Sequence, residues 1–313
     1  YALVGAAGYS GLMVWHGGLS GSAPLKVAES DHEFVEQMGV LPFSATIFSG
    51  TNLVCMGLLL TLVPLAMYWL GQRTAVAAVP DLGSTQTPTL SNTAPPEGAE
   101  RLDHSRMFAS IQGGLMVYMV LYKAVVLPLQ QGKGFDWSFS FINPNFLIFL
   151  LFGLAILLHG NLHRFQQAVS QGIGGTTGIL IQFPLYAGII GIMIQSGLVN
   201  VLSNAFVAIS NPTTFPLFTF VSAGVVNVFV PSGGGQWMVQ GPVLIEASQA
   251  LGVPIERSVL ALCYGDQVTN MLQPFWALPL LGITGLQAKE ILPYTLFLLL
   301  VGMLIFCSVL LFV

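Results

Sequence analysis

The chain has 313 residues, of which 54% are hydrophobic and only 7% are charged, and its formal net charge is −4. Soluble domains carry about 25% charged residues, so water is not the main solvent of this chain. The nine Lys and Arg residues are scattered, which excludes the clustered basic face of a nucleic-acid-binding protein. Cys55, Cys263 and Cys307 lie in apolar runs without CxxC spacing, so we predict reduced thiols and neither a disulfide nor a metal site.

The hydrophobic pattern starts at the first residue. Because the chain begins at Tyr1 without a Met and without a charged leader, we expect an N-terminally truncated fragment of a longer protein. A membrane helix needs about 20 mostly apolar residues. Windows of this kind lie at 53–71, 107–128, 143–159, 176–199 and 291–313. The predicted fold class is therefore all-α, a polytopic membrane protein.

Residues 72–106 have a different composition, with four prolines among Ser, Thr, Asp and Glu, which predicts a solvated linker. The linker divides the chain into 1–71 and 107–313. If the later spans alternate sides, most Lys and Arg residues fall on the side of the linker, which favours a cytoplasmic linker. The linker side of the membrane has Arg73, Arg101, Arg106, Arg164 and Lys289. The opposite side has Lys133 and Arg257, together with Lys123, which lies close to the end of a predicted span.

Two shorter segments have an amphipathic pattern. Residues 159–170 and 200–212 alternate apolar and polar positions, so we expect them at the membrane interface. His159 and His163 have the i, i+4 spacing of a metal-binding pair, but no third ligand accompanies them, and we predict no metal.

The apolar stretch 213–285 is interrupted by Gly, Pro, Ser and Asn. Irregular backbone at membrane depth is tolerated only where protein buries it or where it lines a wet cavity. We therefore expect a re-entrant hairpin at 213–251 with its turn at 231–236, followed by a broken helix at 255–284. A spanning helix with a flexible kink is the alternative.

The same plan occurs near the N-terminus, where residues 1–15 lead into a Gly-rich turn at 16–24. Pro24 and Pro242 lie 218 positions apart, and so do the pairs Thr51-Asn52 and Thr269-Asn270. Weak internal repeats with paired broken segments are typical of secondary transporters with a substrate site between the repeats. Repeats of inverted topology would need two crossings within 39–71, a length that suits one, so the number of crossings there stays open.

The breaks place polar groups where a substrate would bind. Unpaired N–H groups and the positive dipole end at a helix start bind an anion without a lysine, which suits a carboxylate. The predicted substrate-binding residues are Gly18, Ser20, Gly21, Ser22, Thr51, Asn52, Ser232, Gly233, Gly234, Gly235, Gln236, Thr269 and Asn270. The candidates for binding a coupling proton or Na⁺ are Asp266, Asn52 and Asn270, because an acidic group at membrane depth is a functional candidate. For Asp266, a helix N-cap is the other interpretation.

An enzyme is the competing hypothesis. Gly18-Leu19-Ser20-Gly21 matches the GxSG signature of rhomboid-type intramembrane serine proteases, with Ser20 as the nucleophile. Such an enzyme also needs a general base, and His159 and His163 stand at a helix end beside Arg164. We therefore rank the protease below a transporter and predict no enzyme.

The broken segments as a set resemble the bacterial short-chain fatty acid transporter family. The stretches that carry the resemblance are 15–25, 231–237 and 265–270, and 182–186 and 273–276 also fit it. The resemblance implies uptake of short monocarboxylates such as butyrate or acetoacetate across the bacterial inner membrane. We expect no cofactor, and a homodimer is the oligomer that we consider. The family is similar in plan to the ion transporter superfamily, which implies two hairpins and an elevator-like transport domain. Another small organic anion is the alternative substrate.

Overall fold

The computed structural model describes residues 1–74, 97–132, 134, 144–273 and 275–312, with the backbone alone at 144–145, 174–179, 182–183, 186 and 190. All regular structure within these ranges is helical, which confirms the all-α prediction. The chain divides into two compact units, unit 1 (Tyr1–Leu82 and Gly175–Val313) and unit 2 (Gly83–Gly174). Most of the predicted linker, together with Lys133 and Pro274, lies outside the described residues.

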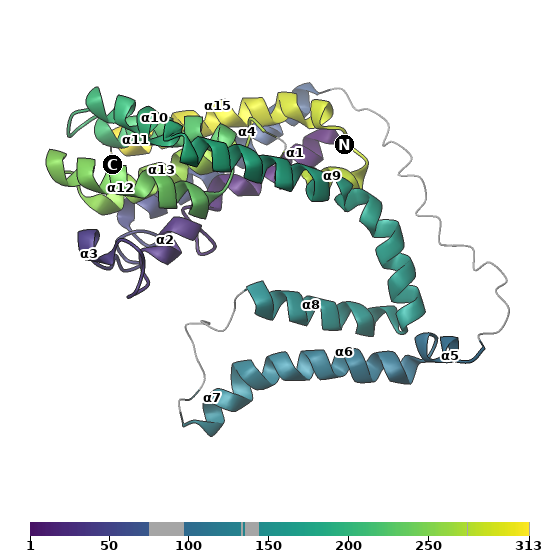
Figure 1. Ribbon diagram of the computed structural model, residues 1–313. Helices are drawn as coiled ribbons and strands as arrows, with labels where there is room; N and C mark the ends of the chain where they lie inside the picture. Colours follow the sequence, from purple (N-terminus) through teal and green to yellow (C-terminus); the bar gives the residue numbers. More distant parts are fainter. Residues whose placement is uncertain (75–96, 133, 135–143, 274, 313) are drawn as a thin grey trace. The chain divides into compact units, whose positions relative to one another are not determined.

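Unit 2 is built around α6 (Arg106–Leu121) and α8 (Pro144–His159), which lie side by side and antiparallel (Figure 1). They pack at two glycines: a Cβ on Gly113 would lie 2.7 Å from the carbonyl oxygen of Gly153. Small residues allow such close approach of helix backbones in membrane proteins. The elements of unit 2 are α5 (Glu100–Asp103), α6 (Arg106–Leu121), the π-turn η2 (Tyr122–Val126), α7 (Leu127–Gln130), α8 (Pro144–His159) and the first part of α9 (Leu162–Gln195).

The segment predicted as an interfacial helix at 159–170 is not a separate element. Its residues form the end of α8 and the first turns of α9, which continues as one helix to Gln195. The break falls at Gly160, where φ is +75°, a conformation that glycine adopts without strain. The parts of α8 and α9 on either side of it are bent by 115°. The boundary between the two helices thus depends on this one glycine, and the place of 159–170 at the membrane interface stays a prediction.

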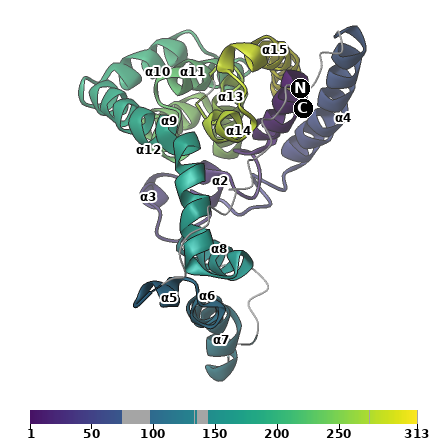
Figure 2. The same ribbon diagram turned by 90° about the vertical axis from the view of Figure 1, so that its right-hand side faces the viewer.

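Unit 1 surrounds one central helix, α13, which packs against α11, α12 and α15 (Figure 2). Every residue from Ser258 to Val268 of α13 is buried. A helix that is buried all round occupies the interior of a domain. The elements of unit 1 are α1 (Ala2–Tyr9), the 3-10 turn η1 (Ser10–Val14), α2 (Ser22–Lys26), α3 (Val35–Met38), α4 (Gly50–Arg73), the rest of α9, α10 (Leu198–Ala208), α11 (Phe215–Phe229), α12 (Gly233–Leu251), α13 (Ile255–Thr269), α14 (Leu278–Thr284) and α15 (Ala288–Phe312).

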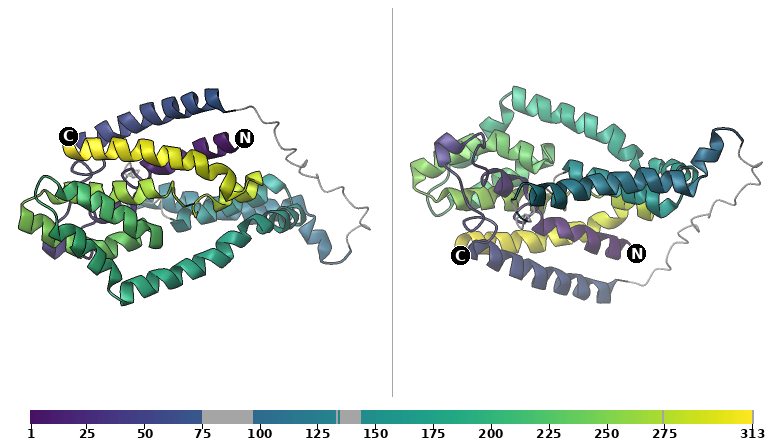
Figure 3. Two further views of the ribbon diagram at one scale, coloured as in Figure 1. Left: turned by 90° about the horizontal axis from the view of Figure 1, so that it is seen from above. Right: turned by 90° about the horizontal axis from the view of Figure 1, so that it is seen from below.

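The closest packing around α13 is with α11. A Cβ on Gly265 would lie 2.1 Å from the carbonyl oxygen of Phe220, so only glycine fits there. On another side of the unit, α4 and α15 lie next to each other (Figure 3). Buried apolar side chains of α1, α4, α13 and α15 form one continuous core. These contacts hold α13 rigidly between its neighbours.

Three helices are long and apolar enough to cross a membrane: Gly50–Arg73, Arg106–Gln130 and Ala288–Phe312. The number rises to five among the described residues if each of two bent helix pairs counts as one span. The chain is thus a multi-pass membrane protein. Within 39–71 the structure has one long helix, α4, and residues 39–49 are not helical, so a single crossing fits this stretch.

The two predicted hairpins differ in their second arms. At 213–251, α11 and α12 are separated by residues 230–232, as the Gly-rich turn predicts. At the N-terminus, α1 and η1 lead into the turn, but α2 after it has only five residues. The broken helix at 255–284 consists of α13 and α14 with residues 270–277 between them. The internal repeat stays a prediction.

Candidate functional site

The two Gly-rich turns, tip 1 (residues 16–24) and tip 2 (residues 231–236), meet in unit 1. Gly233 lies against the ring of His16, since a Cβ at position 233 would be 2.5 Å from His16 Cε1. The next residue, Gly234, faces Ser22 of tip 1, with a Cβ–Cβ distance of 3.5 Å if it carried a side chain. The structure therefore brings together two groups of predicted site residues that are more than 200 positions apart in the sequence.

Tip 2 ends where α12 begins. Ser232 is the N-cap, with its Oγ accepting a hydrogen bond from the Gly235 N–H at 3.4 Å. Its carbonyl oxygen accepts from the Gln236 N–H at 2.7 Å. The N–H groups of Gly233 and Gly234 have no such partner among the described residues. These N–H groups lie at the positive end of the dipole of α12, a 19-residue helix, and Gly233 and Gly234 themselves lie beside tip 1.

Tip 1 is attached to α13 by a buried contact between a histidine and a carboxylate. His16 Nδ1 lies 2.5 Å from Oδ2 of Asp266, and the two side chains are 0% and 1% exposed. The other ring nitrogen, Nε2, accepts a hydrogen bond from the backbone N–H of Ala23 at 3.2 Å. Trp15 stacks on the ring at a centroid distance of 4.9 Å. His16 is thus held on every side, by charge, backbone and aromatic contact.

Two amides hold the backbone of tip 1. Gln267 Oε1 accepts hydrogen bonds from the N–H groups of His16, at 2.8 Å, and Gly17, at 3.1 Å. Asn52, at the start of α4, donates to the carbonyl oxygens of Gly17, at 2.8 Å, and Ile47, at 2.7 Å. The hydroxyl of Tyr264 donates to Asn52 Oδ1 at 2.9 Å. The first Thr-Asn pair therefore contacts tip 1 through Asn52, whereas Thr51 is half-buried beside it.

The second Thr-Asn pair is bound to α11. Asn227 Nδ2 lies 3.0 Å from Thr269 Oγ1, 3.1 Å from Asn270 Oδ1 and 2.8 Å from the carbonyl oxygen of Asp266. Gln273 donates to the Asn227 carbonyl oxygen at 3.0 Å. Because Asp266 also contacts His16, this group and tip 1 meet on the same end of α13. The four groups of predicted site residues converge there.

Five buried polar atoms of residues around this end of α13 have no hydrogen-bond partner among the described residues. The donors are Gln267 Nε2 and Asn270 Nδ2, and the acceptors are Asn227 Oδ1, Gln236 Oε1 and Asp266 Oδ1. Buried polar atoms without partners are rare in folded proteins, and each calls for an explanation. Their concentration at the predicted site indicates polar chemistry there in addition to packing.

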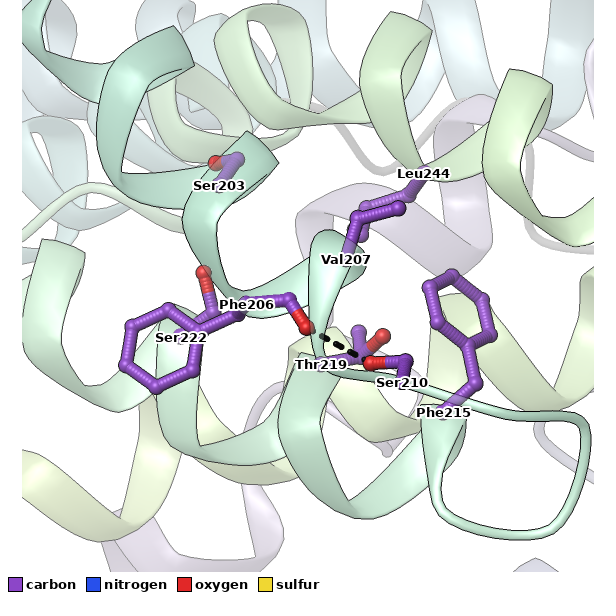
Figure 4. A pocket seen from close by; sticks show the side chains of 8 residues that line it. All are labelled: Ser203, Phe206, Val207, Ser210, Phe215, Thr219, Ser222 and Leu244. Carbon is purple, nitrogen blue, oxygen red and sulfur yellow. Dashed lines mark hydrogen bonds between the residues drawn. The ribbon is translucent and has the colours of Figure 1, made fainter.

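Two cavities in unit 1 lie elsewhere. One, between α10, α11 and α12, is too narrow to hold a water molecule, and its lining includes Ser203 and Ser222 (Figure 4). Both of these hydroxyls accept hydrogen bonds from Gln240, at 2.9 and 3.2 Å. The other cavity, of about 100 Å³, lies between η1 and α4. Neither of these two cavities is lined by tip 1 or tip 2.

The protease hypothesis finds no support in unit 1. Ser20 is exposed and makes no hydrogen bond to the described residues. His16 has both ring nitrogens engaged, and so does His32, which contacts the Phe34 N–H and the Gly39 carbonyl oxygen. His163 belongs to unit 2, where it stacks on His104. No described histidine of unit 1 is therefore placed as a base for Ser20.

The sequence profile of the short chain fatty acid transporter family matches residues 1–313. The chain belongs to this family. A family member from Escherichia coli, named provisionally as a short-chain fatty acid transporter, is 38% identical over 300 residues, which cover 94% of this chain and 65% of the relative. A relative of the same provisional name from Haemophilus influenzae is 36% identical over 315 residues, covering 94% of this chain and 66% of the relative. The chain thus spans about two thirds of the length of these family members. No solved structure matches it.

Several residues that build the site in the chain described here were not predicted to belong to the site. His16 and Gln267 lie inside the motifs and are fully buried polar residues, which need a buried hydrogen-bond partner. Asn227 lies in an apolar run without neighbouring polar residues, and Tyr264 directly precedes the motif at 265–270. Among the aromatic residues of the broken segments, Trp237 is 1% exposed and packs edge-on against Phe34 in the core. Trp276 is exposed, and the centroid of its ring lies 6.4 Å from the centroid of the Trp15 ring.

Proposed function

We propose that this chain carries short-chain monocarboxylates, such as butyrate or acetoacetate, across the bacterial inner membrane as a secondary transporter. The observation that carries the proposal is the meeting of tip 1 and tip 2 at His16 and Gly233, beside one end of the buried helix α13. Broken segments that face each other at depth are typical of the substrate sites of secondary transporters. Membership of the family agrees with this substrate class.

In this proposal, the substrate carboxylate binds at the start of α12. The unpaired N–H groups of Gly233 and Gly234 and the helix dipole attract it, and the unpartnered amide nitrogens of Gln267 and Asn270 add donors. A short alkyl tail then contacts aromatic rings such as Trp276. The remaining predicted contacts are Gly18, Ser20, Gly21, Ser22, Thr51, Asn52, Ser232, Gly235, Gln236 and Thr269.

Movement of the site across the membrane is driven by a cation that accompanies the substrate. Asp266 has a buried carboxylate oxygen without a partner, whereas Asn270 Oδ1 accepts a hydrogen bond from Asn227 and both side-chain groups of Asn52 are hydrogen-bonded. This contrast favours Asp266 over Asn270 and Asn52 as the group that binds the coupling ion. An internal repeat with an elevator-like movement, and a homodimer that anchors it, complete the proposal.

Full-length protein in liposomes tests the proposal. Labelled butyrate is added under an imposed pH or Na⁺ gradient, and we expect saturable uptake that concentrates it. Absence of uptake above empty liposomes under either gradient would refute the transporter, and flux that never saturates would indicate a channel instead. Labelling of Ser20 by a fluorophosphonate probe would support the protease.

A further inference from the structure

The contact between His16 and Asp266 is the only contact between a basic and an acidic side chain, among the described residues, in which both side chains are buried. The other two such contacts join Lys26 to Glu29 and to Glu33, and all three of those side chains are more than a third exposed. Burial of a carboxylate is costly and adds little stability by itself. A buried pair that joins tip 1 to the central helix therefore calls for a function, and in a membrane interior such groups mark proton and ion pathways.

The hydrogen bonds fix where protons sit on the pair. Nε2 of His16 accepts from the Ala23 N–H, so it carries no proton, and the single proton of the neutral ring is on Nδ1. That proton is donated to Asp266 Oδ2. The second carboxylate oxygen, Oδ1, is buried and has no partner among the described residues. One more proton can bind at Oδ1 without breaking any contact of tip 1, whereas a proton on Nε2 would displace Ala23.

No other charge faces the pair from the described elements that pack around it. The ring meets α2 through the Ala23 backbone, α12 through Gly233, and α13 through Asp266 and the thiol of Cys263. The described charged residues of α2 and α12 are Lys26, which pairs with surface glutamates, and Glu246, which is exposed. Without a proton at Oδ1 the pair thus has a net charge of about −1 in a buried site.

We propose that the His16–Asp266 pair binds the coupling proton, at Oδ1 of Asp266, and that the substrate enters the site together with it. The inference rests on the proposed function and names the coupling ion. A carboxylate bound beside tip 2 would add a second negative charge close to Asp266, and like charges in a buried site repel strongly. One proton at Oδ1 removes this repulsion. The proton enters with the substrate on one side and leaves on the other when the site is exposed there.

The pair also connects the proton to movement. His16 holds tip 1 on α13 together with Gln267, and its ring forms the surface on which Gly233 of tip 2 rests. A change of charge at Asp266 therefore alters the attachment of tip 1 and the contact between both tips. His16 acts as a positioning residue, because it places the carboxylate and leaves the substrate to other groups.

The first test measures butyrate affinity of wild-type full-length protein in detergent, over a pH range in which butyrate stays ionised. If one proton binds with each substrate, the dissociation constant rises about tenfold per pH unit wherever the free site is unprotonated. The substrate then binds more tightly at lower pH. An affinity that does not change with pH refutes the inference without any variant.

The second test compares Asp266→Asn with Glu246→Gln, the same chemical change on an exposed position of α12. We expect Asp266→Asn to exchange butyrate in counterflow but to lose at least about tenfold of its accumulation under a pH gradient, and Glu246→Gln to behave as wild type. Accumulation by Asp266→Asn at the wild-type level overturns the inference. If Asp266→Asn does not elute as a folded protein, His16→Gln is used, and a wild-type pH slope in that variant contradicts the proposal.

The outcomes separate this inference from the proposed function. If wild-type protein neither binds nor takes up butyrate under any gradient, the transport function itself fails. If uptake is normal but follows a Na⁺ gradient and not a pH gradient, the transporter stands and the proton site at Asp266 is refuted.

Discussion

Gly233 of tip 2 lies directly on the imidazole of His16 of tip 1, with room for a hydrogen atom and not for a methyl group. A Cβ at position 233 would lie 2.5, 2.8 and 2.9 Å from the ring atoms Cε1, Nε2 and Nδ1. Because His16 is also bonded to Asp266 and Ala23, the ring cannot turn away without breaking those contacts. This single contact couples the two broken segments.

Gly233→Ala is expected to separate the tips and abolish transport. Overpacking a rigid contact costs about 1–3 kcal/mol, which is roughly a 5-fold to 150-fold loss of the packed conformation. Butyrate uptake in liposomes measures the effect. The control is Gly57→Ala in α4, where a Cβ would have nothing within 4 Å. Wild-type uptake by Gly233→Ala would show that the contact is not needed.

Gly265→Ala is expected to destabilise unit 1 as a whole. The added methyl would lie 2.1 Å from the Phe220 carbonyl oxygen and 2.8 Å from Ala223 Cβ, so α11 must move away from α13. We expect a loss of about 1–3 kcal/mol or more in the free energy of unfolding, measured by thermal unfolding in detergent. Gly8→Ala, in open space on α1, should leave the melting temperature within a few degrees of wild type.

Gln267→Leu is expected to release tip 1 while α13 stays folded. The substitution removes the acceptor of two buried backbone N–H groups, and each unsatisfied group costs about 1–3 kcal/mol. Trypsin cleavage after Lys26, which is partly exposed at the end of α2, should become at least several-fold faster. The matched control is Gln249→Leu, an exposed residue with one hydrogen bond to the Gln37 carbonyl oxygen. Equal cleavage rates in the two variants would mean that Gln267 does not hold the tip.

Asn52 and Tyr264 are expected to act as one unit. The Tyr264 hydroxyl donates to Asn52 Oδ1, and both side chains are buried. In a double-mutant cycle with Asn52→Ala and Tyr264→Phe, we expect a coupling energy of about 0.5–3 kcal/mol in the free energy of unfolding. The pair Tyr68 and Gln72, hydrogen-bonded on the exposed face of α4, serves as the comparison and should couple by less. Additive effects of the two site mutations would contradict the expected coupling.

The positions of the helix breaks could be predicted because their causes are local. Ser232 followed by three glycines starts α12, and Gly252 ends it with φ +68°, so the residues themselves define the hairpin. The first hairpin was less predictable, since tip 1 contains the same residue types but continues into only five helical residues. There the backbone is held by Gln267 and Asn52, which come from distant parts of the chain.

The contact between His16 and Asp266 could not be predicted from spacing. His16 and Asp266 are 250 positions apart, and only the packing of α13 against tip 1 brings them together. Asp266 was recognised because a carboxylate at membrane depth is unusual, but nothing near it in the sequence points to His16. Asn227 likewise lies in an apolar run and acquires its three acceptors only when α11 packs on α13.

Because α13 is buried, the reaction rate of native thiols can be used to measure how often the helices of unit 1 separate. Cys263 and Cys55 are 0% exposed, and Cys307 is half-buried on α15. Once Cys307 is replaced by Ser, a maleimide reagent can reach Cys55 and Cys263 only while the helices that bury them are apart. The alkylation rate of these two thiols then reports how often the helices separate, with no foreign residue placed in the interior.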